Sequence, residues 1–387
     1  MSLSEFITQS ERFTSWCQGA LKDWHRVAAD PRGGFAEFRD ITGAPNFDAV
    51  RRVRVQFRLA YVYALAGHLG WYDHAQMASD QAWDFATTSG FQSGALDLES
   101  GKGGCAHLIG GGGALVDPYR DSYAQAFVIL AGAWRYRAFG DIQSLNITES
   151  TLAFLDSHLT SEYGGYEEGF PLRGGPRRQN PHMHLFEALL ALFEATGDKK
   201  YKARIDALYG LFKAHFFDKN TGAIYEFFNS DFTKYKGGGP YEPGHMMEWA
   251  WLLSEYERLR AVNMSAEILK LKQAAMEMGY RPKVGFIIDS CVPQGKQTSE
   301  RFRSWPQTEL IKAHVSLALK GDMESLPIIS KTIDRMFDTY FQTDVPSGWH
   351  DQLDHDGQII QADMQSSTFY HIICAAAEVS RLQTHLT

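Results

Sequence analysis

The sequence predicts an all-α fold, an (α/α)6 barrel of six helical hairpins, from three observations. The first is a polar anchor that returns every 61 to 65 residues and opens an apolar stretch each time. The anchors are Arg58, Tyr123, His184, His245, Glu309 and His371. The second is a more polar, amphipathic stretch between successive apolar ones, and the third is an amphipathic N-terminus. A period of this length suits a pair of helices with its loops.

The apolar stretches after the anchors predict the inner helices. RLAYVYALAG begins at Arg58 and HLFEALLALFEATGD begins at His184, and both are apolar nearly all round. A helix of that kind is buried rather than lying at the surface. Six such helices in a ring would gather their polar starts at one end, and we expect the active site there.

The amphipathic stretches predict the outer helices, at 71–88, 141–159, 199–217, 265–280 and 323–341. Glycines after inner stretches are expected as C-caps, at Gly67, Gly140, Gly197 and Gly321. Five outer stretches leave one inner helix without a partner. The amphipathic residues 3–29 supply it, packing beside 368–382 and closing the ring. An open superhelix would need polar capping repeats, which the sequence lacks.

The long loops repeat as well, and they predict the active-site end of the barrel. Each carries a glycine followed by a carboxylate, at Glu37, Asp117, Glu168, Glu226, Asp289 and Asp351. We expect these carboxylates to bond within the loops or to cap helices. The stretch GAIYEFF predicts small β-hairpins. The glycine-rich residues 101–117 predict a mobile loop at the mouth of the cavity.

Composition narrows the class of protein. The 387 residues carry a net charge of −8 and no Lys/Arg run, which argues against a nucleic-acid surface. No linker-like stretch divides the chain, so we predict one catalytic domain over 1–387. Its four cysteines form no CxxC pair and predict buried thiols in a reducing compartment. The start of the chain lacks a signal peptide and no segment suits a membrane, which predicts a cytoplasmic protein, as a monomer or a homodimer.

Two anchors share a local pattern, His184-x-x-Glu187 and His245-x-x-Glu248. Residues three apart on a helix share a face, so each carboxylate is expected to raise the pKa of its histidine and to hold its tautomer. His371 adds a third imidazole at the sixth anchor. Together they predict general acid–base chemistry.

Other interpretations of these histidines stay open. Di-metal helical bundles use Glu-x-x-His, the reverse order, and no HExxH motif is present. Three imidazoles in one cavity could still bind a metal, and buried structural histidines are common. We predict neither a metal nor another cofactor. His182, two residues from an anchor, is expected on another helix face, in a supporting or surface position.

Arg58 is expected to meet an anion or a developing negative charge, because a guanidinium among aromatic residues is costly to bury. The alternative is an ion pair with Glu309 or Glu248. Asn180, one turn before His184, can donate and accept hydrogen bonds, which suits a hydroxyl-bearing ligand.

Trp305 and Glu309, four residues apart, combine a flat apolar surface with a carboxylate. Aromatic faces with interleaved carboxylates, amides and imidazoles predict a pocket for a sugar or polyol. A phosphate site fits poorly, since the chain has no P-loop and no basic cluster.

Four segments resemble the N-acylglucosamine 2-epimerase superfamily: NPHMHLFEALLALFEATGD, YEPGHMMEWAWLL, WPQTEL and STFYHIICAAAE. The resemblance covers essentially the whole chain, and NPHMH and STFYH are most similar to the bacterial D-mannose isomerase branch. It implies an (α/α)6 barrel and a cofactor-independent enzyme that acts on a monosaccharide.

The resemblance also implies roles for individual residues. His245 and His371 match the family's acid–base pair, and Glu248 matches the carboxylate beside the first of them. The positions that match substrate or intermediate binding and the pocket wall are Arg58, Asn180, His184, Trp305 and Glu309. Tyr123 stands at a position that varies in the family.

We therefore expect an isomerase that interconverts D-mannose and D-fructose through a cis-enediol, with D-lyxose and D-xylulose as a further pair. A sugar 2-epimerase shares the same intermediate and stays an alternative. A non-catalytic sugar-binding protein on the same barrel is a third. A glycoside hydrolase would need a carboxylate pair as acid and base, whereas the anchors here are mainly histidines.

Overall fold

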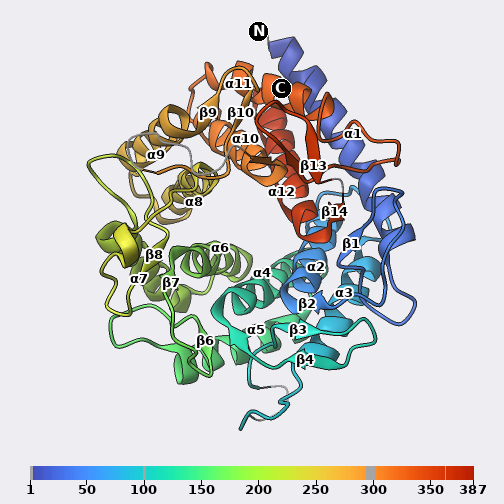
Figure 1. Cartoon of the computed structure of the whole chain (residues 1–387), viewed down its shortest axis with the longest axis vertical. Helices are drawn as coiled ribbons and strands as arrows, with labels where there is room; N and C mark the ends of the chain where they lie inside the picture. The colour runs from blue at the N-terminus through green and yellow to red at the C-terminus, as the bar shows by residue number, and fades with distance from the viewer. Residues whose placement is uncertain (1–2, 99–101, 293–300, 362) are drawn as a thin grey trace.

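A computed structural model describes residues 3–98, 102–292, 301–361 and 363–387, and these form an (α/α)6 barrel, as predicted (Figure 1). Each inner helix packs against the next, and the last packs against the first. The inner helices are α2 (Val53–His68), α4 (Ser122–Phe139), α6 (Gln179–Thr196), α8 (Pro243–Arg260), α10 (Ser304–Ala318) and α12 (Ser366–Leu386). They are buried on most sides, as their apolar sequences require.

The outer helices bury one face each against the inner ring. They are α1 (Leu3–Ala28), α3 (Ala75–Gly90), α5 (Ile142–Phe154), α7 (Lys202–Leu211), α9 (Ser265–Gly279) and α11 (Ser325–Phe337). Single π-helical turns extend α5 over Leu155–Leu159 and α7 over Phe212–Phe216. Among the described residues no helix is long and apolar enough to cross a membrane.

The N-terminal helix closes the ring, as the count of outer stretches predicts. The blue helix α1 lies against α11 and α12 from the far end of the sequence (Figure 1). Its aromatic side chains also pack on the segment between α11 and α12, with Trp24 stacked on Trp349 at 4.7 Å and Trp16 on Phe341 at 4.2 Å between ring centroids. Aromatic pairs of this kind add to the stabilisation from burial alone.

Short antiparallel strands join the long loops into a continuous rim. The strand before each inner helix pairs with the loop of the following repeat. These strands are β2 (Arg51–Arg52) with β3 (Leu108–Ile109), β5 (Arg120–Asp121) with β6 (Gly169–Phe170), β7 (Arg177–Arg178) with β8 (Phe227–Phe228), β11 (Phe302–Arg303) with β12 (Gln352–Leu353), and β14 (Met364–Gln365) with β1 (Phe38–Arg39). A bridge between Tyr241 and Cys291 makes the sixth link.

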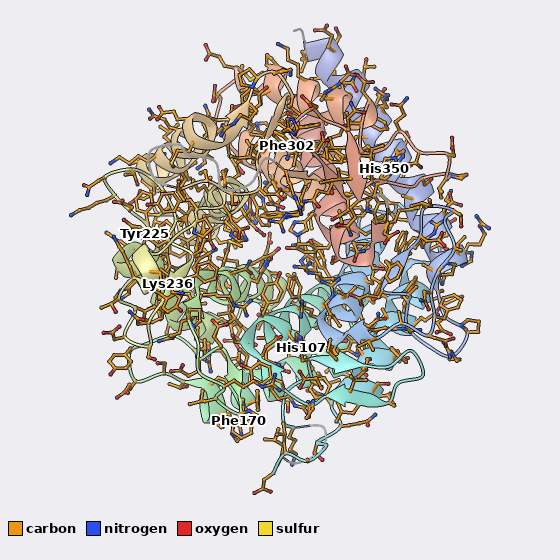
Figure 2. The ribbon with its side chains drawn as sticks, viewed as in Figure 1. His107, Phe170, Tyr225, Lys236, Phe302 and His350 are labelled. Carbon is orange, nitrogen blue, oxygen red and sulfur yellow. The ribbon has the colours of Figure 1, made fainter. Side chains whose placement is uncertain are left out.

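The remaining strands extend the rim locally. They are β4 (Leu115–Asp117) beside β3, β13 (Ile359–Gln361) beside β12, and β9 (Tyr280–Arg281) paired with β10 (Phe286–Ile287). Residues of these loops labelled in Figure 2, among them His107, Tyr225, Phe302 and His350, are distributed around the ring. GAIYEFF takes part in a local bridge from Phe217 to Ile224. Its β8 pairs with β7 and also forms a local antiparallel bridge from Phe228 to Lys234.

A repeated side-chain clamp fastens the loops to the inner helices. Gln56 accepts a hydrogen bond from the backbone N–H of Phe35 and donates to its carbonyl, at 2.8 and 3.0 Å. Gln125 binds Cys105 in the same way, and Gln307 binds Ile287. These glutamines are the fourth residues of their helices. The fourth residue of α6 is His182, whose Nε2 accepts a hydrogen bond from the N–H of Tyr166 at 3.0 Å. His182 is therefore a buried loop clamp, and a surface position for it is wrong.

The glycines confirm part of the predicted capping. Gly140 and Gly197 end α4 and α6 in the left-handed conformation, as expected. Gly67 instead lies inside α2, where a Cβ would meet the ring of Phe139 at 2.7 Å. Gly321 follows α10 by three residues with φ +95°. Residue 101 of the predicted mobile loop lies outside the described residues, and β3 and β4 give part of 102–117 regular structure.

Candidate active site

A cavity of about 390 Å³ opens at the end of the ring where the inner helices begin. Eight of the nine predicted site residues line it: Arg58, Tyr123, Asn180, His184, His245, Glu248, Trp305 and His371. The ninth, Glu309, is fully buried behind His371 and is absent from the described lining. Arg52, Glu242, Arg303 and Asp351 complete the charged part of the wall.

His371 lines the cavity, and a buried carboxylate contacts its Nδ1. Its Nδ1 lies 2.8 Å from Glu309 Oε1, while Glu309 Oε2 lies 2.8 Å from the ammonium of Lys312. Burial raises the pKa of Glu309, but Lys312 and His371 outweigh it and lower the pKa to about 2. An anionic Glu309 accepts the Nδ1–H of His371, which leaves Nε2 as the basic nitrogen.

Burial determines the charge of His371 itself. It lowers the pKa of the imidazole to about 4, although Glu309 acts in the opposite direction. The ring is therefore neutral at physiological pH, and its free Nε2 can accept a proton. The expectation that a neighbouring carboxylate would raise the pKa is wrong at this position, because desolvation of the cation is the larger effect.

His245 is held by a loop carboxylate rather than by its own helix. Its Nδ1 lies 3.0 Å from Glu226 Oε1 and 3.7 Å from Glu242. Burial lowers the pKa of His245, but Glu226 and Glu242 together raise it to about 10. The ring is cationic at neutral pH and can act as an acid. The prediction that Glu248 pairs with His245 is therefore wrong, because Glu226 holds that imidazole instead.

Asn180 occupies the other nitrogen of His245. Its amide Nδ2 lies 2.9 Å from Nε2, and its Oδ1 is buried without a hydrogen-bond partner. An amide can present NH2 to a neutral imidazole or its oxygen to a cationic one. Asn180 therefore fits His245 before and after proton transfer.

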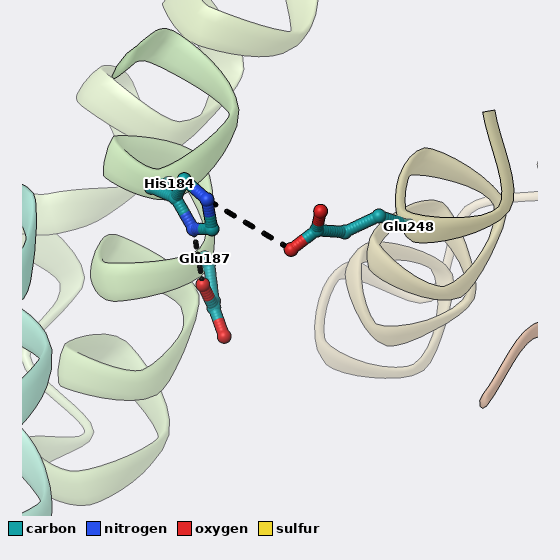
Figure 3. Close-up of side chains that lie close together, drawn as sticks. All are labelled: His184, Glu187 and Glu248. Atoms are coloured by element: carbon teal, nitrogen blue, oxygen red, sulfur yellow. Dashed lines mark hydrogen bonds and ion pairs between the residues drawn. The ribbon is translucent and has the colours of Figure 1, made fainter. Parts of the chain in front are cut away.

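His184 forms the predicted pair with Glu187, and Glu248 approaches from α8 (Figure 3). His184 Nδ1 lies 2.9 Å from Glu187 Oε2, and Nε2 lies 3.9 Å from Glu248 Oε1. The hydroxyl of Tyr370 also donates to Glu187. Burial lowers the pKa of His184 to about 4 despite Glu187, so this ring too is neutral.

Burial favours the protonated form of the Glu248 carboxyl group. Burial, and then the charge of Glu309, raises its pKa well above the ordinary value. Its Oε1 is buried without a hydrogen-bond partner. A neutral carboxylic acid can both donate to and accept from a sugar hydroxyl.

Arg58 is held by aromatic rings. Its guanidinium donates to the hydroxyl of Tyr123 at 2.6 Å and lies over the rings of Phe127 at 4.2 Å and Tyr370 at 4.9 Å. Within the described residues no carboxylate pairs with Arg58, so the alternative of an ion pair with Glu309 or Glu248 is wrong. The positive charge remains available to the cavity.

Trp305 packs beside both candidate acid–base groups. Its ring centroid lies 5.2 Å from that of His245 and 5.4 Å from that of His371, with an interplanar angle of 39° in both cases. The indole therefore provides an apolar surface next to both imidazoles. Such a surface suits the apolar face of a sugar ring.

Three sets of side chains place metal-ligand atoms within 4.8 Å of one another. They are His184, Glu187 and Glu248; Glu226, Glu242 and His245; and Glu248, Glu309 and His371. In each set an imidazole nitrogen already shares a hydrogen bond or an ion pair with a carboxylate. Proton sharing accounts for this clustering, and we retain the prediction of a metal-free reaction.

Two residues of the site were missed in the sequence. The sequence pattern places Glu226 with the structural loop carboxylates. The one signal is that residue 242, before the next inner helix, is not an arginine, and the loops that end at Asp121 and Gln365 share this signal. Lys312 carries no signal, because a lysine three residues after a glutamate is typical of an exposed helix face.

Comparison with known proteins places this geometry in a family. The family model described as N-acylglucosamine 2-epimerase matches residues 33–375. The chain belongs to the N-acylglucosamine 2-epimerase family. The predicted resemblance is confirmed, and with it an enzyme of a family that acts on sugars.

Individual relatives carry two kinds of names. The chain is 31% identical over 385 residues to a mannose-6-phosphate isomerase of Rhizobium meliloti, covering 96% of each chain. It is 21% identical to a cellobiose 2-epimerase of Dictyoglomus turgidum, covering 82% of this chain and 83% of the other. A crystal structure of a D-mannose isomerase superposes with a TM-score of 0.86 at 21% identity, over 99% of both chains.

Proposed function

We propose that this protein is a cofactor-independent aldose–ketose isomerase that interconverts D-mannose and D-fructose. The observation that carries the proposal is the pair of imidazoles next to Trp305, with pKa values shifted in opposite directions. Environments that separate two pKa values in this way define an acid and a base. The names of the isomerase relatives agree with this assignment.

The proton transfers follow from the two charge states. After the sugar ring opens, His371 Nε2 removes the C2 proton, and the C2–H electrons form the C1=C2 double bond. The carbonyl oxygen O1 takes a proton from His245, giving a cis-enediol. The proton on His371 exchanges with solvent, and His371 then delivers a proton to C1, while the O2–H proton goes back to His245 and C2 becomes the ketone. Both histidines end in their starting states.

Arg58 stabilises the charge that develops between these steps. Its guanidinium is fixed by Tyr123 and carries no carboxylate partner in the described chain. A cation aimed at a developing enediolate contributes more to rate than one that binds only the ground state. We assign Asn180, His184, Glu248 and Trp305 to the sugar hydroxyls and the apolar ring face, with Glu309 acting from behind His371.

The charges of the wall favour a neutral sugar over its phosphate. Arg52 is bound by Glu37, and Arg303 lies between Asp289 and Glu242. Asp351 adds a further carboxyl group to this side of the cavity. A dianionic phosphate would have to compete with these carboxylates for each arginine. We therefore infer free D-mannose as the substrate, despite the name of the Rhizobium meliloti relative.

An NMR time course in D2O tests the proposal, with D-mannose and D-mannose 6-phosphate as parallel substrates. We expect D-fructose with deuterium at C1 from mannose, and much slower turnover of the phosphate. Faster turnover of the phosphate would overturn the substrate. Fructose without deuterium would overturn the exchange of the proton with solvent.

A sugar 2-epimerase is the second candidate. Two imidazoles beside Trp305 would suffice to deliver a proton to either face of C2, and the Dictyoglomus turgidum relative bears an epimerase name. The same time course distinguishes the two. The appearance of the C2 epimer before any ketose would establish the epimerase.

A further inference from the structure

A fully buried lysine lies beneath the cavity, in a position where a charge is costly unless it is paired. Lys312 on α10 has its Nζ 2.8 Å from Glu309 Oε2 and 3.6 Å from the ring centroid of Trp251. Burial lowers the pKa of Lys312, but Glu309 and Glu248 outweigh it and keep the pKa above its ordinary value. The ammonium is therefore cationic and forms an ion pair with one oxygen of Glu309.

The two oxygens of Glu309 connect this lysine to the candidate base. Oε2 faces Lys312, and Oε1 lies 2.8 Å from His371 Nδ1. Neither Lys312 nor Glu309 belongs to the described lining of the cavity. Among the described residues, the shortest contacts from Lys312 to the cavity run through Glu309 to the imidazole of His371.

The groups around Lys312 come from four inner helices. Glu309 shares its helix, Glu248 and Trp251 lie on α8, Glu187 lies on α6, and Cys374 lies on α12. Three carboxyl groups thus surround one ammonium. Loss of its charge would leave Glu309 buried near two other carboxyl groups, where the protonated form is favoured.

We propose that Lys312 is a positioning residue that keeps Glu309 anionic and thereby holds His371 in the tautomer with a basic Nε2. Without the ammonium, a protonated Glu309 donates its O–H to Nδ1. The ring proton then resides on Nε2, facing the cavity, where it cannot accept a proton from substrate. The consequence for turnover rests on the proposed function, whereas the tautomer does not.

Three variants of the full chain test the proposal: Lys312→Met, Glu309→Gln and the double variant. Lys312→Met should lower kcat by about 10²-fold or more, the contribution of a general base. Glu309→Gln should lower it as far, because the ammonium attracts the amide oxygen and turns the NH2 toward Nδ1. A wrong tautomer of this kind costs about 10⁴-fold in the serine-protease triad.

The double variant provides the decisive comparison. Without the ammonium the amide can turn its oxygen toward the Nδ1–H of His371, so the active tautomer returns. We expect the double variant to recover at least about tenfold over Glu309→Gln, a coupling between neighbours that independent effects would not show. A double variant no better than Glu309→Gln would overturn the proposal. Removing both partners of a buried ion pair is tolerated better than removing one, so this comparison holds even where Lys312→Met does not fold.

The tautomer can be read without substrate, by NMR of 15N-histidine with the signal of His371 assigned through His371→Asn. We expect Nε2 to be unprotonated in the wild type and the double variant, and protonated in each single variant. An unchanged His371 signal in Glu309→Gln would overturn the proposal. If the tautomers change as expected while no aldose is converted, the proposed function fails and the role of Lys312 stands.

Lys320→Met is the matched control. Lys320 pairs with Glu257 at 3.0 Å and is partly exposed beyond the end of α10. Lys320→Met removes a lysine charge and its ion pair, as Lys312→Met does, but away from Glu309. We expect unchanged turnover and an unchanged His371 signal. A change equal to that of Lys312→Met would show a general effect of charge and overturn the proposal.

Discussion

The loop carboxylates before α6 and before α8 stand at the same place in their repeats, each four residues after a glycine, but they bind different partners. Glu168 accepts hydrogen bonds from the backbone N–H and the Nε of Arg178, at 2.6 and 2.7 Å. Glu226 accepts from His245 Nδ1 and from Gln179, both at 3.0 Å. One carboxylate fastens a loop to a helix start, whereas the other supports a candidate acid.

The difference lies in the residue before the helix. The clamp of Arg178 recurs at Arg303, bound by Asp289, and at Arg52, bound by Glu37. Before α8 the corresponding residue is Glu242, which has no N–H on its side chain to donate. Glu226 is thereby free for His245. Where the arginine that binds the loop carboxylate is absent, the carboxylate is available to bind a histidine of the site.

The largest effect should come from the imidazoles themselves. His371→Ala and His245→Ala should each lower kcat by about 10²–10⁴-fold, the usual contribution of a proton-transfer group. Steady-state kinetics at neutral pH checks this, with circular dichroism to verify folding. His182→Ala is the control, since His182 clamps a loop and should affect stability more than turnover. Near-normal rates in either anchor variant would refute the acid–base assignment.

Glu226→Gln should sharpen the comparison through the pH profile. The wild type needs neutral His371 and cationic His245, so kcat/KM should fall below about pH 4 and above about pH 10. Glu226 raises the pKa of His245, so its loss should move the alkaline limb to lower pH. Glu168→Gln should leave that limb in place. An equal shift in both variants would show that the two carboxylates do not differ in function.

Glu168→Gln should instead lower stability. Loss of the carboxylate weakens the bonds to the N–H and Nε of Arg178, which costs about 1–3 kcal/mol for a buried, charged hydrogen bond. The free energy of unfolding from urea titration measures this, beside kcat at neutral pH. Stability equal to the wild type, or a loss of turnover like that of Glu226→Gln, would break the distinction between the two carboxylates.

Chelation should have the smallest effect. Each of the three imidazoles already has its Nδ1 beside a carboxylate in the described site, so we expect EDTA to leave turnover unchanged. Dialysis against EDTA followed by an assay checks this. Loss of activity that a divalent metal restores would assign the clustered carboxylates to metal binding in place of proton sharing.

The architecture could be predicted from the sequence because it follows from the spacing of the polar anchors and the apolar stretches. A period of 61 to 65 residues, apolar helices after each anchor and a spare amphipathic N-terminus require a closed ring of hairpins. Capping glycines were predicted where a left-handed residue ends a helix, as at Gly140 and Gly197. The prediction for Gly67 was wrong. Close packing on Phe139 also requires a glycine, and the sequence does not distinguish that requirement from a C-cap.

The cavity-lining anchors could be predicted, but their partners could not. His245 and Glu248 share a helix face, yet Glu248 reaches His184 across the barrel while a loop residue, Glu226, binds His245. Contacts between repeats depend on the register of one helix against another, which no local spacing encodes. The direction of each pKa shift could not be predicted for the same reason, because it depends on burial and on charges that several helices bring together.

Closure of the ring by the first helix also affects how the chain is made. The apolar face of α1 is covered by α11 and α12, the last helices to be synthesised. Until they emerge, Trp16 and Trp24 lack the aromatic partners that they contact in the finished barrel. A nascent chain therefore holds an unsatisfied apolar strip at its beginning for almost the whole of translation, and the same adjacency of first and last helices makes this barrel a natural subject for circular permutation.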